Sequence, residues 1–352
     1  MKILTLSLIL LNIHFIAFSQ TESNPKFEPE PFDYVSLIQK KKGHGVKKEI
    51  LLITFPKRQG SADTSSVVKY DQSGDLIHRT LYSQGKPYLI ADHSTSKDRK
   101  TTKWKTQPVA KTDRISVNIT SYLPNGKMSW FKNSDINQKG DTTLIELVKF
   151  TYNAQHQLLT RTDQTNGKVT LQRNYQYANG NMIKYTSKPT NSSGLTSFLY
   201  TYDNQHLPVK KQHIITNSFG EQVYQTFNYT YLNARVVKER YTNPEGDKKD
   251  VLVKYVYDAN GRIKSFRAAQ DSLFREVIFT FEADRLVQIN ASGNTLKALN
   301  REFQIYAEYT QNHEPFTFRK EFKYDDKGNL IGETEFLNEV KRRQIEYMIT
   351  YW

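Results

Sequence analysis

Aromatic and polar side chains alternate along most of the chain, and this pattern predicts half-buried antiparallel strands. The clearest phrase is Tyr255-Val256-Tyr257, which leads through Asp258 to Gly261. Rings at every second position lie on one face of a strand, and the residues between them lie on the other face. This motif recurs along the chain, and we call the Tyr or Phe just before each turn the anchor residue. The anchors are Tyr70, Tyr122, Tyr152, Tyr177, Tyr202, Tyr231, Tyr257, Phe281 and Tyr324. From Tyr152 to Phe281 the anchors are spaced by 25, 25, 29, 26 and 24 residues, which indicates an array of supersecondary units.

A turn with its own chemistry follows the anchor. Asp occupies the next position at Asp71, Asp203, Asp258 and Asp325, and Gly comes four residues after the anchor at Gly74, Gly126, Gly261 and Gly328. An Asp carboxylate at the start of a type I turn accepts a hydrogen bond from the backbone two residues on, and Gly takes the positive-φ position. His156 and His206 stand at the Gly position, and His tolerates positive φ better than most residues. Each unit of about 25 residues is therefore predicted to be a β-hairpin.

The predicted fold class is all-β: an antiparallel meander of hairpins that forms one curled sheet, either open or closed. A one-sided sheet must hide its apolar face, and curling is the most direct way to do so when no helix covers it. The repeats are clearest over 140–352. They lapse over 85–114, which is either a long loop or a degenerate hairpin, and again over 291–312. The last residues, Ile349-Thr350-Tyr351-Trp352, repeat the apolar-Thr-Tyr pattern, and this final strand is predicted to close or cap the sheet.

The first residues predict export. Residues 1–19 carry Lys2, an apolar run, and small residues at Ala17 and Ser19 before a cut at Gln20, as in a secretory signal peptide. Such a start resembles leaders common in Bacteroidota. Residues 20–32 are predicted to be a disordered, Pro-containing spacer, and 33–352 a single β-repeat domain. No other stretch is long and apolar enough for a transmembrane helix, and no Cys is present, so the expected location is the periplasm, the cell surface or the exterior.

Several phrases resemble the YD repeat of the RHS family: Tyr255 to Ile263, Phe322 to Leu330, and Tyr200-Thr201-Tyr202-Asp203-Asn204. The resemblance covers roughly residues 66–352. It implies a long antiparallel sheet that spirals into a shell around a toxin, or folded modules at cell surfaces. The chain departs from large family members because it has about nine units, no recognisable C-terminal toxin and no cleavage motif. The resemblance therefore assigns no activity to particular residues.

The mature chain is predicted to carry a net positive charge, which bears on the molecules that it binds. Removing the leader takes one Lys from 50 Lys and Arg, and 49 against 36 Asp and Glu leaves a net charge of +13. Such a surface suits acidic polymers, or it keeps strand surfaces soluble. The candidate ligand-binding residues are Lys103, Trp104, Lys105 and Trp130, because both Trp residues lie off the aromatic ladder. The expected partner is an acidic polysaccharide or another envelope protein, and not nucleic acid.

No residue pattern points to catalysis, a metal or a cofactor. Nucleophile motifs and phosphate-binding loops are missing, and the His residues do not have metal-ligand spacing. Asp258 to Gly261 resembles a fragment of a calcium loop, but the remaining ligands are absent, which favours a turn. The predicted function is a non-enzymatic, exported β-repeat scaffold or binding protein. The alternatives are an outer-membrane β-barrel, and a secreted carbohydrate-active enzyme or RHS-like shell fragment.

Overall fold

The computed structural model describes residues 46–54, 63–83, 86–98, 100–109, 115–137, 139–242, 249–294 and 315–351. The predicted leader (1–19) and spacer (20–32) lie outside the described residues, as does most of the stretch 291–312, over which the repeats lapse in the sequence. In the described part of the chain, no helix is long and apolar enough to cross a membrane.

In the described residues, twenty-two strands make up a single sheet. Their bounds are β1 (Val46–Thr54), β2 (Asp63–Tyr70), β3 (Leu76–Ser83), β4 (Lys86–Thr95), β5 (Thr101–Pro108), β6 (Ile115–Tyr122), β7 (Met128–Ile136), β8 (Thr142–Tyr152), β9 (Leu158–Thr165), β10 (Lys168–Ala178), β11 (Asn181–Pro189), β12 (Leu195–Tyr202), β13 (Pro208–Asn217), β14 (Gly220–Leu232), β15 (Arg235–Thr242), β16 (Asp250–Tyr257), β17 (Ile263–Gln270), β18 (Leu273–Glu282), β19 (Arg285–Gly293), β20 (Phe316–Tyr324), β21 (Leu330–Leu337) and β22 (Val340–Tyr351).

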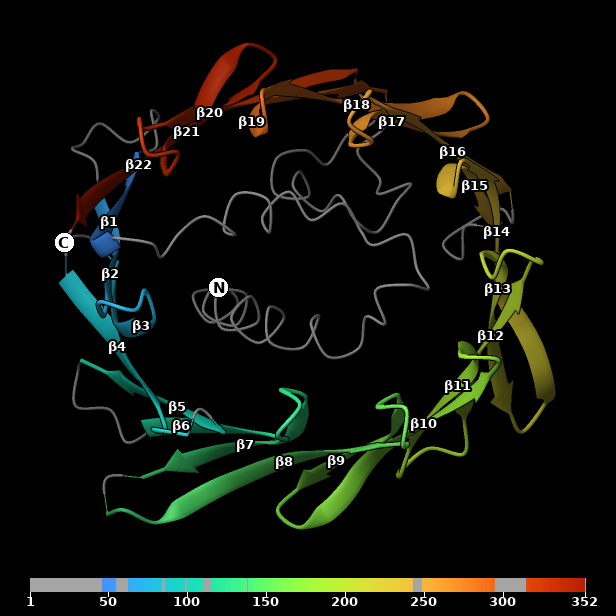
Figure 1. Cartoon of the computed structure of the whole chain (residues 1–352), viewed down its shortest axis with the longest axis horizontal. Helices are drawn as coiled ribbons and strands as arrows, with labels where there is room; N and C mark the ends of the chain where they lie inside the picture. The colour runs from blue at the N-terminus through green and yellow to red at the C-terminus, as the bar shows by residue number, and fades with distance from the viewer. Residues whose placement is uncertain are drawn as a thin grey trace.

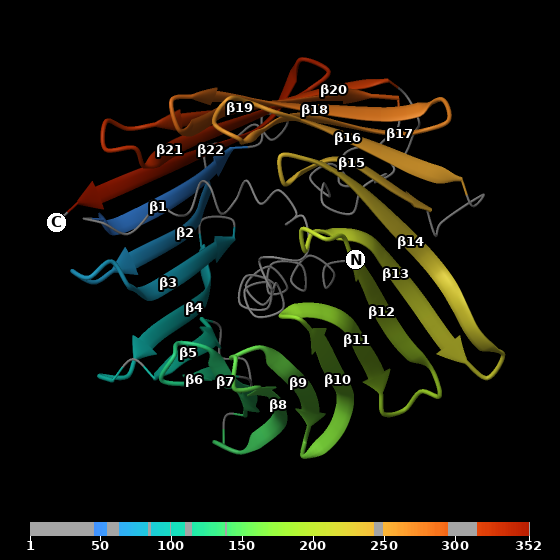
Figure 2. The ribbon, with the colours of Figure 1, turned by 45° about the vertical axis from the view of Figure 1, so that its right-hand side comes forward.

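The sheet is an antiparallel meander closed into a ring, as Figures 1 and 2 show. Each strand pairs with the next along the chain, and β22 pairs antiparallel with β1 through partners such as Glu49 and Ile349. The predicted all-β meander of hairpins is therefore confirmed, and of the two expected forms the sheet takes the closed one. The ambiguous stretch 85–114 contains the hairpin of β4 and β5. Closure removes both sheet edges, which would otherwise expose unpaired backbone groups.

One face of the sheet is buried and the other is exposed. Along β18, Val277 and Phe279 are buried, whereas Ile278 and Thr280 between them are exposed. Val251, Val253, Val277 and Ile289 have 0% exposure, all on the same face of their strands. The convex outer face of a ring meets solvent, so side chains this deeply buried assign their face to the inside. The aromatic face predicted from the alternation is thus the inner wall.

The turns have the predicted chemistry. Gly261 adopts φ 80°, and His156 and His206, which replace Gly in their turns, adopt φ 61° and 62°. The Asp258 carboxylate accepts a hydrogen bond from the backbone N–H of Arg262 at 2.9 Å, and Asp325 accepts one from Asn329 at 2.8 Å. In these two turns the Asp carboxylate therefore holds the residue just before the return strand. The predicted bond from the backbone two residues on is present at Asp71, which accepts from Ser73 at 2.9 Å, and at Asp203, which accepts from Gln205 at 2.9 Å.

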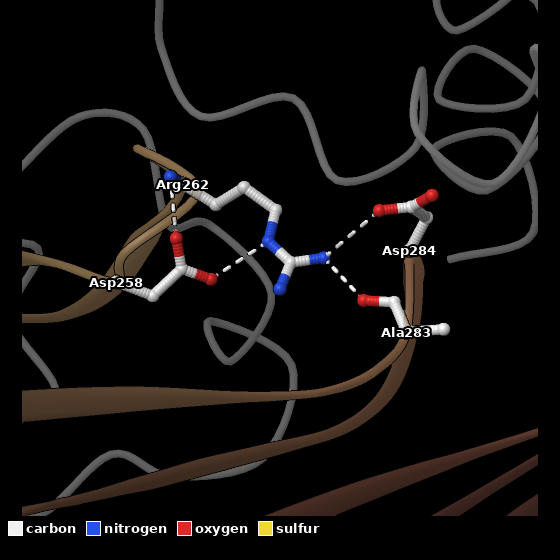
Figure 3. A network of polar contacts seen from close by, with 4 residues as sticks. All are labelled: Asp258, Arg262, Ala283 and Asp284. Atoms are coloured by element: carbon white, nitrogen blue, oxygen red, sulfur yellow. Dashed lines mark hydrogen bonds and ion pairs between the residues drawn. The ribbon is translucent and has the colours of Figure 1, made fainter.

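Arg262 connects the turn between β16 and β17 with the turn between β18 and β19, as Figure 3 shows. Its Nε donates to Asp258 Oδ2 at 2.7 Å within its own turn. Its Nη1 donates to the carbonyl oxygen of Ala283 at 2.6 Å and lies 3.6 Å from Asp284 Oδ1 in the turn of the next unit. The guanidinium also lies 4.2 Å from the centroid of the Phe281 ring, the anchor of that unit. Neighbouring units are thus tied together at their turns.

The anchor tyrosines form a second link between units. In six of them, the hydroxyl donates to a backbone carbonyl at the start of the previous return strand. The pairs are Tyr152 with Met128 (2.7 Å), Tyr177 with Leu158 (3.0 Å), Tyr202 with Met182 (2.6 Å), Tyr231 with Pro208 (2.8 Å), Tyr257 with Val236 (2.7 Å) and Tyr324 with Leu286 (2.7 Å). The repeated Tyr therefore joins each unit to the preceding unit as well as packing against it.

Because the anchor tyrosines are partly buried in the neutral form, we expect the protein to unfold in alkali. Burial raises the pKa of Tyr177 and of Tyr324 to about 12, from a usual value of 10.0. A raised folded-state pKa means that stability is fully present below pH 10 and is lost as the pH rises from 10 through about 12. We expect the tyrosinate absorbance of these groups to appear together with loss of the β-sheet circular dichroism signal. Ionisation of the anchor tyrosines in a sheet that stays folded would contradict this prediction.

Candidate functional site on the two faces of strands β4 to β8

The polarity of the two faces is inverted in one sector of the ring. Along β16 to β19 the inner face is largely apolar, but in β6 the apolar Val117 and Ile119 alternate with the inner-facing Asn118 and Thr120. The assignment follows from the register, because Asn118 pairs with the buried Asn133, which shares a face with the buried Asp135. In β6, therefore, polar side chains lie on the inner face and apolar side chains lie on the outer face.

The outer face of the sector is basic. Lys103 and Lys105 are exposed on β5, Lys149 is exposed on β8, and Lys132 and Trp130 on β7 are partly exposed. Trp130 pairs with Lys149, and Lys132 is separated from Lys103 by Ile119 in one cross-strand row. No Asp or Glu lies on the outer face of β5 to β8 in the described strands, whereas on β4 Asp92 is the register partner of Lys105 and lies 2.7 Å from His78 Nδ1. We call the four Lys residues and Trp130 the outer basic patch.

Trp104 lies on the inner face, opposite its neighbours Lys103 and Lys105. Its ring is 4.5 Å from that of His93 on β4, measured between centroids, and its register partner on β6 is Asn118. The four predicted ligand-binding residues are therefore divided between two faces. Lys103, Lys105 and Trp130 share the outer face, and Trp104 belongs to the inner wall.

A row of polar side chains continues from Trp104 across the inner wall. Asn118 pairs with Asn133, and Asn133 pairs with Glu146. Asn133 Nδ2 donates to Glu146 Oε2 at 3.0 Å, and its Oδ1 accepts from Ser116 Oγ at 3.0 Å. Directly opposed residues on neighbouring strands lie about 5 Å apart and face the same side. We call His93, Trp104, Asn118, Asn133 and Glu146 the inner polar row.

The repeat pattern of the sequence does not predict a site at His93, Asn118, Asn133 and Glu146. The available signal was the alternation Ser116-Val117-Asn118-Ile119-Thr120, in which every second residue is polar. Alternation by itself does not state which set faces inward, and the cross-strand register decides that.

A second group of charges is buried in the inner wall next to the closure. Lys320 Nζ lies 2.5 Å from Glu333 Oε2 and 3.2 Å from Glu335 Oε1, and Arg343 Nη2 lies 2.6 Å from Glu335 Oε1. Tyr347 donates to Glu333 at 2.5 Å. Burial by itself would raise the pKa of Glu333, but the Lys320 ammonium and the hydrogen bonds from Lys320 and Tyr347 bring it below its usual value. Two cations balance two carboxylates, so the group is a structural ion cluster.

In the described strands and turns, no group of three or more His, Asp or Glu side chains could hold a metal ion. The Asp258 and Asp325 loops are turns whose carboxylates bind backbone N–H groups. The resemblance of Asp258 to Gly261 to a calcium loop therefore has its explanation in turn geometry.

Comparison with known proteins gives structural similarities only. No protein-family model matches the chain, and no curated protein sequence matches it. Similar solved structures include TcdB2-TccC3 without its hypervariable C-terminal region, with 14% identity and a TM-score of 0.39 over 84% of this chain. They also include the Photorhabdus luminescens Tc holotoxin pore, with 12% identity and a TM-score of 0.37 over 85% of this chain. This chain covers 19% and 18% of those two chains, respectively.

A porin-like protein from Bacteroides uniformis is also similar. Its identity is 11% and its TM-score 0.28, over 88% of this chain and 98% of that chain. At these identities and TM-scores, none of the similarities assigns a function, which must be argued from the residues themselves.

Proposed function

We propose that the protein is a non-enzymatic, exported β-shell of the cell envelope or exterior that binds an acidic polysaccharide through the outer basic patch. The observation that carries the proposal is the charge of that patch, in which four Lys side chains share the outer face with Trp130 and no acid lies on that face in β5 to β8. Ammonium groups attract carboxylate or sulfate groups, and an indole ring offers an apolar surface beside them.

The chemistry of the outer face favours this function over an outer-membrane barrel. The outer face of a membrane barrel is an apolar band in contact with lipid, and a charged side chain near the middle of that band is destabilising. Here Lys254 and Arg267 lie exposed on the outer faces of β16 and β17, and Glu276 lies on that of β18. The inner face holds the apolar core instead. This distribution suits a shell that is surrounded by water.

Charge reversal tests the patch. We expect Lys103→Glu combined with Lys105→Glu to weaken binding to polygalacturonate by about tenfold or more, equivalent to about 1.4 kcal/mol. The measurement is the salt concentration that releases the protein from an immobilised polygalacturonate column, because exposed ion pairs are screened by salt.

A matched control has the same change in net charge elsewhere on the outer face. Lys238→Glu combined with Lys254→Glu alters an exposed, register-paired couple on β15 and β16 and should leave retention close to that of the unaltered protein. Equal losses in the two double variants would assign retention to overall charge and not to the patch.

Cell fractionation tests the location. A water-exposed shell held by electrostatic contacts should leave the envelope fraction in high salt without detergent. Extraction by detergent alone would instead favour the outer-membrane barrel.

A further inference from the structure

The inner polar row is a surface distinct from the outer basic patch, and it has the composition of a sugar site. Its five residues come from five consecutive strands and occupy one register row. With strands spaced about 4.8 Å apart, the row is about 19 Å long. It presents an indole, an imidazole, two amides and a carboxylate on one wall.

We propose that the inner polar row binds a neutral saccharide, with Trp104 as the surface on which a sugar ring stacks. The apolar C–H face of a sugar packs against an aromatic ring, and its hydroxyl groups both donate and accept hydrogen bonds. Amides and carboxylates supply the matching acceptors and donors. A few placed polar groups beside an aromatic surface are typical of small-molecule sites.

The groups of the row are held in place by the wall itself. His93 Nδ1 lies 2.7 Å from the carbonyl oxygen of Leu76, which fixes the imidazole against Trp104. Asn133 is held between Ser116 and Glu146 by two hydrogen bonds of 3.0 Å. Side chains that are already held in place lose little conformational entropy when a ligand binds, which favours binding.

Asn118 points to a missing ligand group. Its Oδ1 atom is buried and has no hydrogen-bond partner among the described residues. Buried polar atoms are nearly always paired, so an orphaned one requires an explanation. A hydroxyl donor from a saccharide stacked on the adjacent Trp104 would satisfy this acceptor.

The charged residues on the inner face of this sector favour a neutral saccharide over an acidic one. Asp135 and Glu146 are the acidic residues on the inner face of β5 to β8, and no Lys or Arg lies on that face in the described strands. Carboxylates would repel an acidic sugar. The two faces of this sector therefore suit opposite ligands, an acidic polymer outside and a neutral saccharide inside.

Calorimetric titration of the purified full chain with cellohexaose, maltohexaose and chitohexaose tests the proposal. We expect at least one of these neutral probes to bind, Trp104→Ala to weaken that binding at least tenfold, and Asn118→Ala to weaken it severalfold. Trp130→Ala is the matched control on the outer face and should bind the probe like the unaltered protein. Trp104→Phe keeps an aromatic ring and should retain part of the affinity.

Three results would overturn the proposal: no binding of any neutral probe, equal losses in the Trp104→Ala and Trp130→Ala variants, or equal binding of polygalacturonate fragments at this row. If Trp104→Ala fails to fold, the Asn118→Ala and Trp104→Phe variants decide the outcome. Retention of the Trp104→Ala variant on polygalacturonate separates this site from the outer basic patch, because the proposed function does not require Trp104.

Discussion

Replacing Lys320 with alanine should lower the free energy of unfolding by about 3–5 kcal/mol, because it leaves the buried carboxylates of Glu333 and Glu335 without their shared cation. The Lys320 side chain is 6% exposed, and those of Glu333 and Glu335 are 9% and 3% exposed. Arg343 compensates only one of the two carboxylates directly. Denaturant unfolding followed by circular dichroism measures the change.

Lys323 provides the control for this prediction. It lies three residues further along β20, on the exposed outer face, so Lys323→Ala should change the stability by no more than about 0.5 kcal/mol. Equal stability of the Lys320→Ala and Lys323→Ala variants would show that the ion cluster is solvated and would contradict its place in the inner wall.

Replacing Phe279 with alanine should also cost about 3–5 kcal/mol, because it leaves a cavity in the most deeply buried part of the wall. Phe279 is 2% exposed, its ring centroid lies 6.3 Å from that of Phe266, and its register partner Ile289 is 0% exposed. Thermal unfolding of the purified variant measures the loss.

Thr280→Ala, one residue away on the exposed face of β18, should stay within about 0.5 kcal/mol of the unaltered protein. The contrast between adjacent residues tests the face assignment directly. If Phe279→Ala melted at an unchanged temperature and instead lost ligand binding, the inner rings would be a binding platform and not a core.

The sequence by itself determined the strands, the turns and the faces of the later units. Alternation at Tyr255 and Tyr257, followed by Asp258 and Gly261, specifies a hairpin through contacts between near neighbours, and the structure has that hairpin. His156 was assigned to a positive-φ position from its place in the repeat, and it adopts φ 61°. Such features are local, since each depends on a few consecutive residues.

The candidate site was only partly predictable. Trp104 and Trp130 were singled out because they lie off the aromatic ladder, but their opposite faces follow from the register of β5, β6 and β7. The inner polar row joins His93 to Glu146, which lie on strands separated by three others. A one-residue shift in register would turn each of these side chains to the other face, and local alternation does not fix the register between strands.

Closure was decided by the tertiary structure alone. The alternation predicts a sheet with an apolar face, and that requirement is met equally by an open curl or by a ring. The ring forms because β1 pairs with β22, which places Glu49 opposite Ile349, 300 positions later in the chain. A contact over that separation depends on the twist and curvature accumulated through all the intervening strands, and no short stretch of sequence encodes that sum.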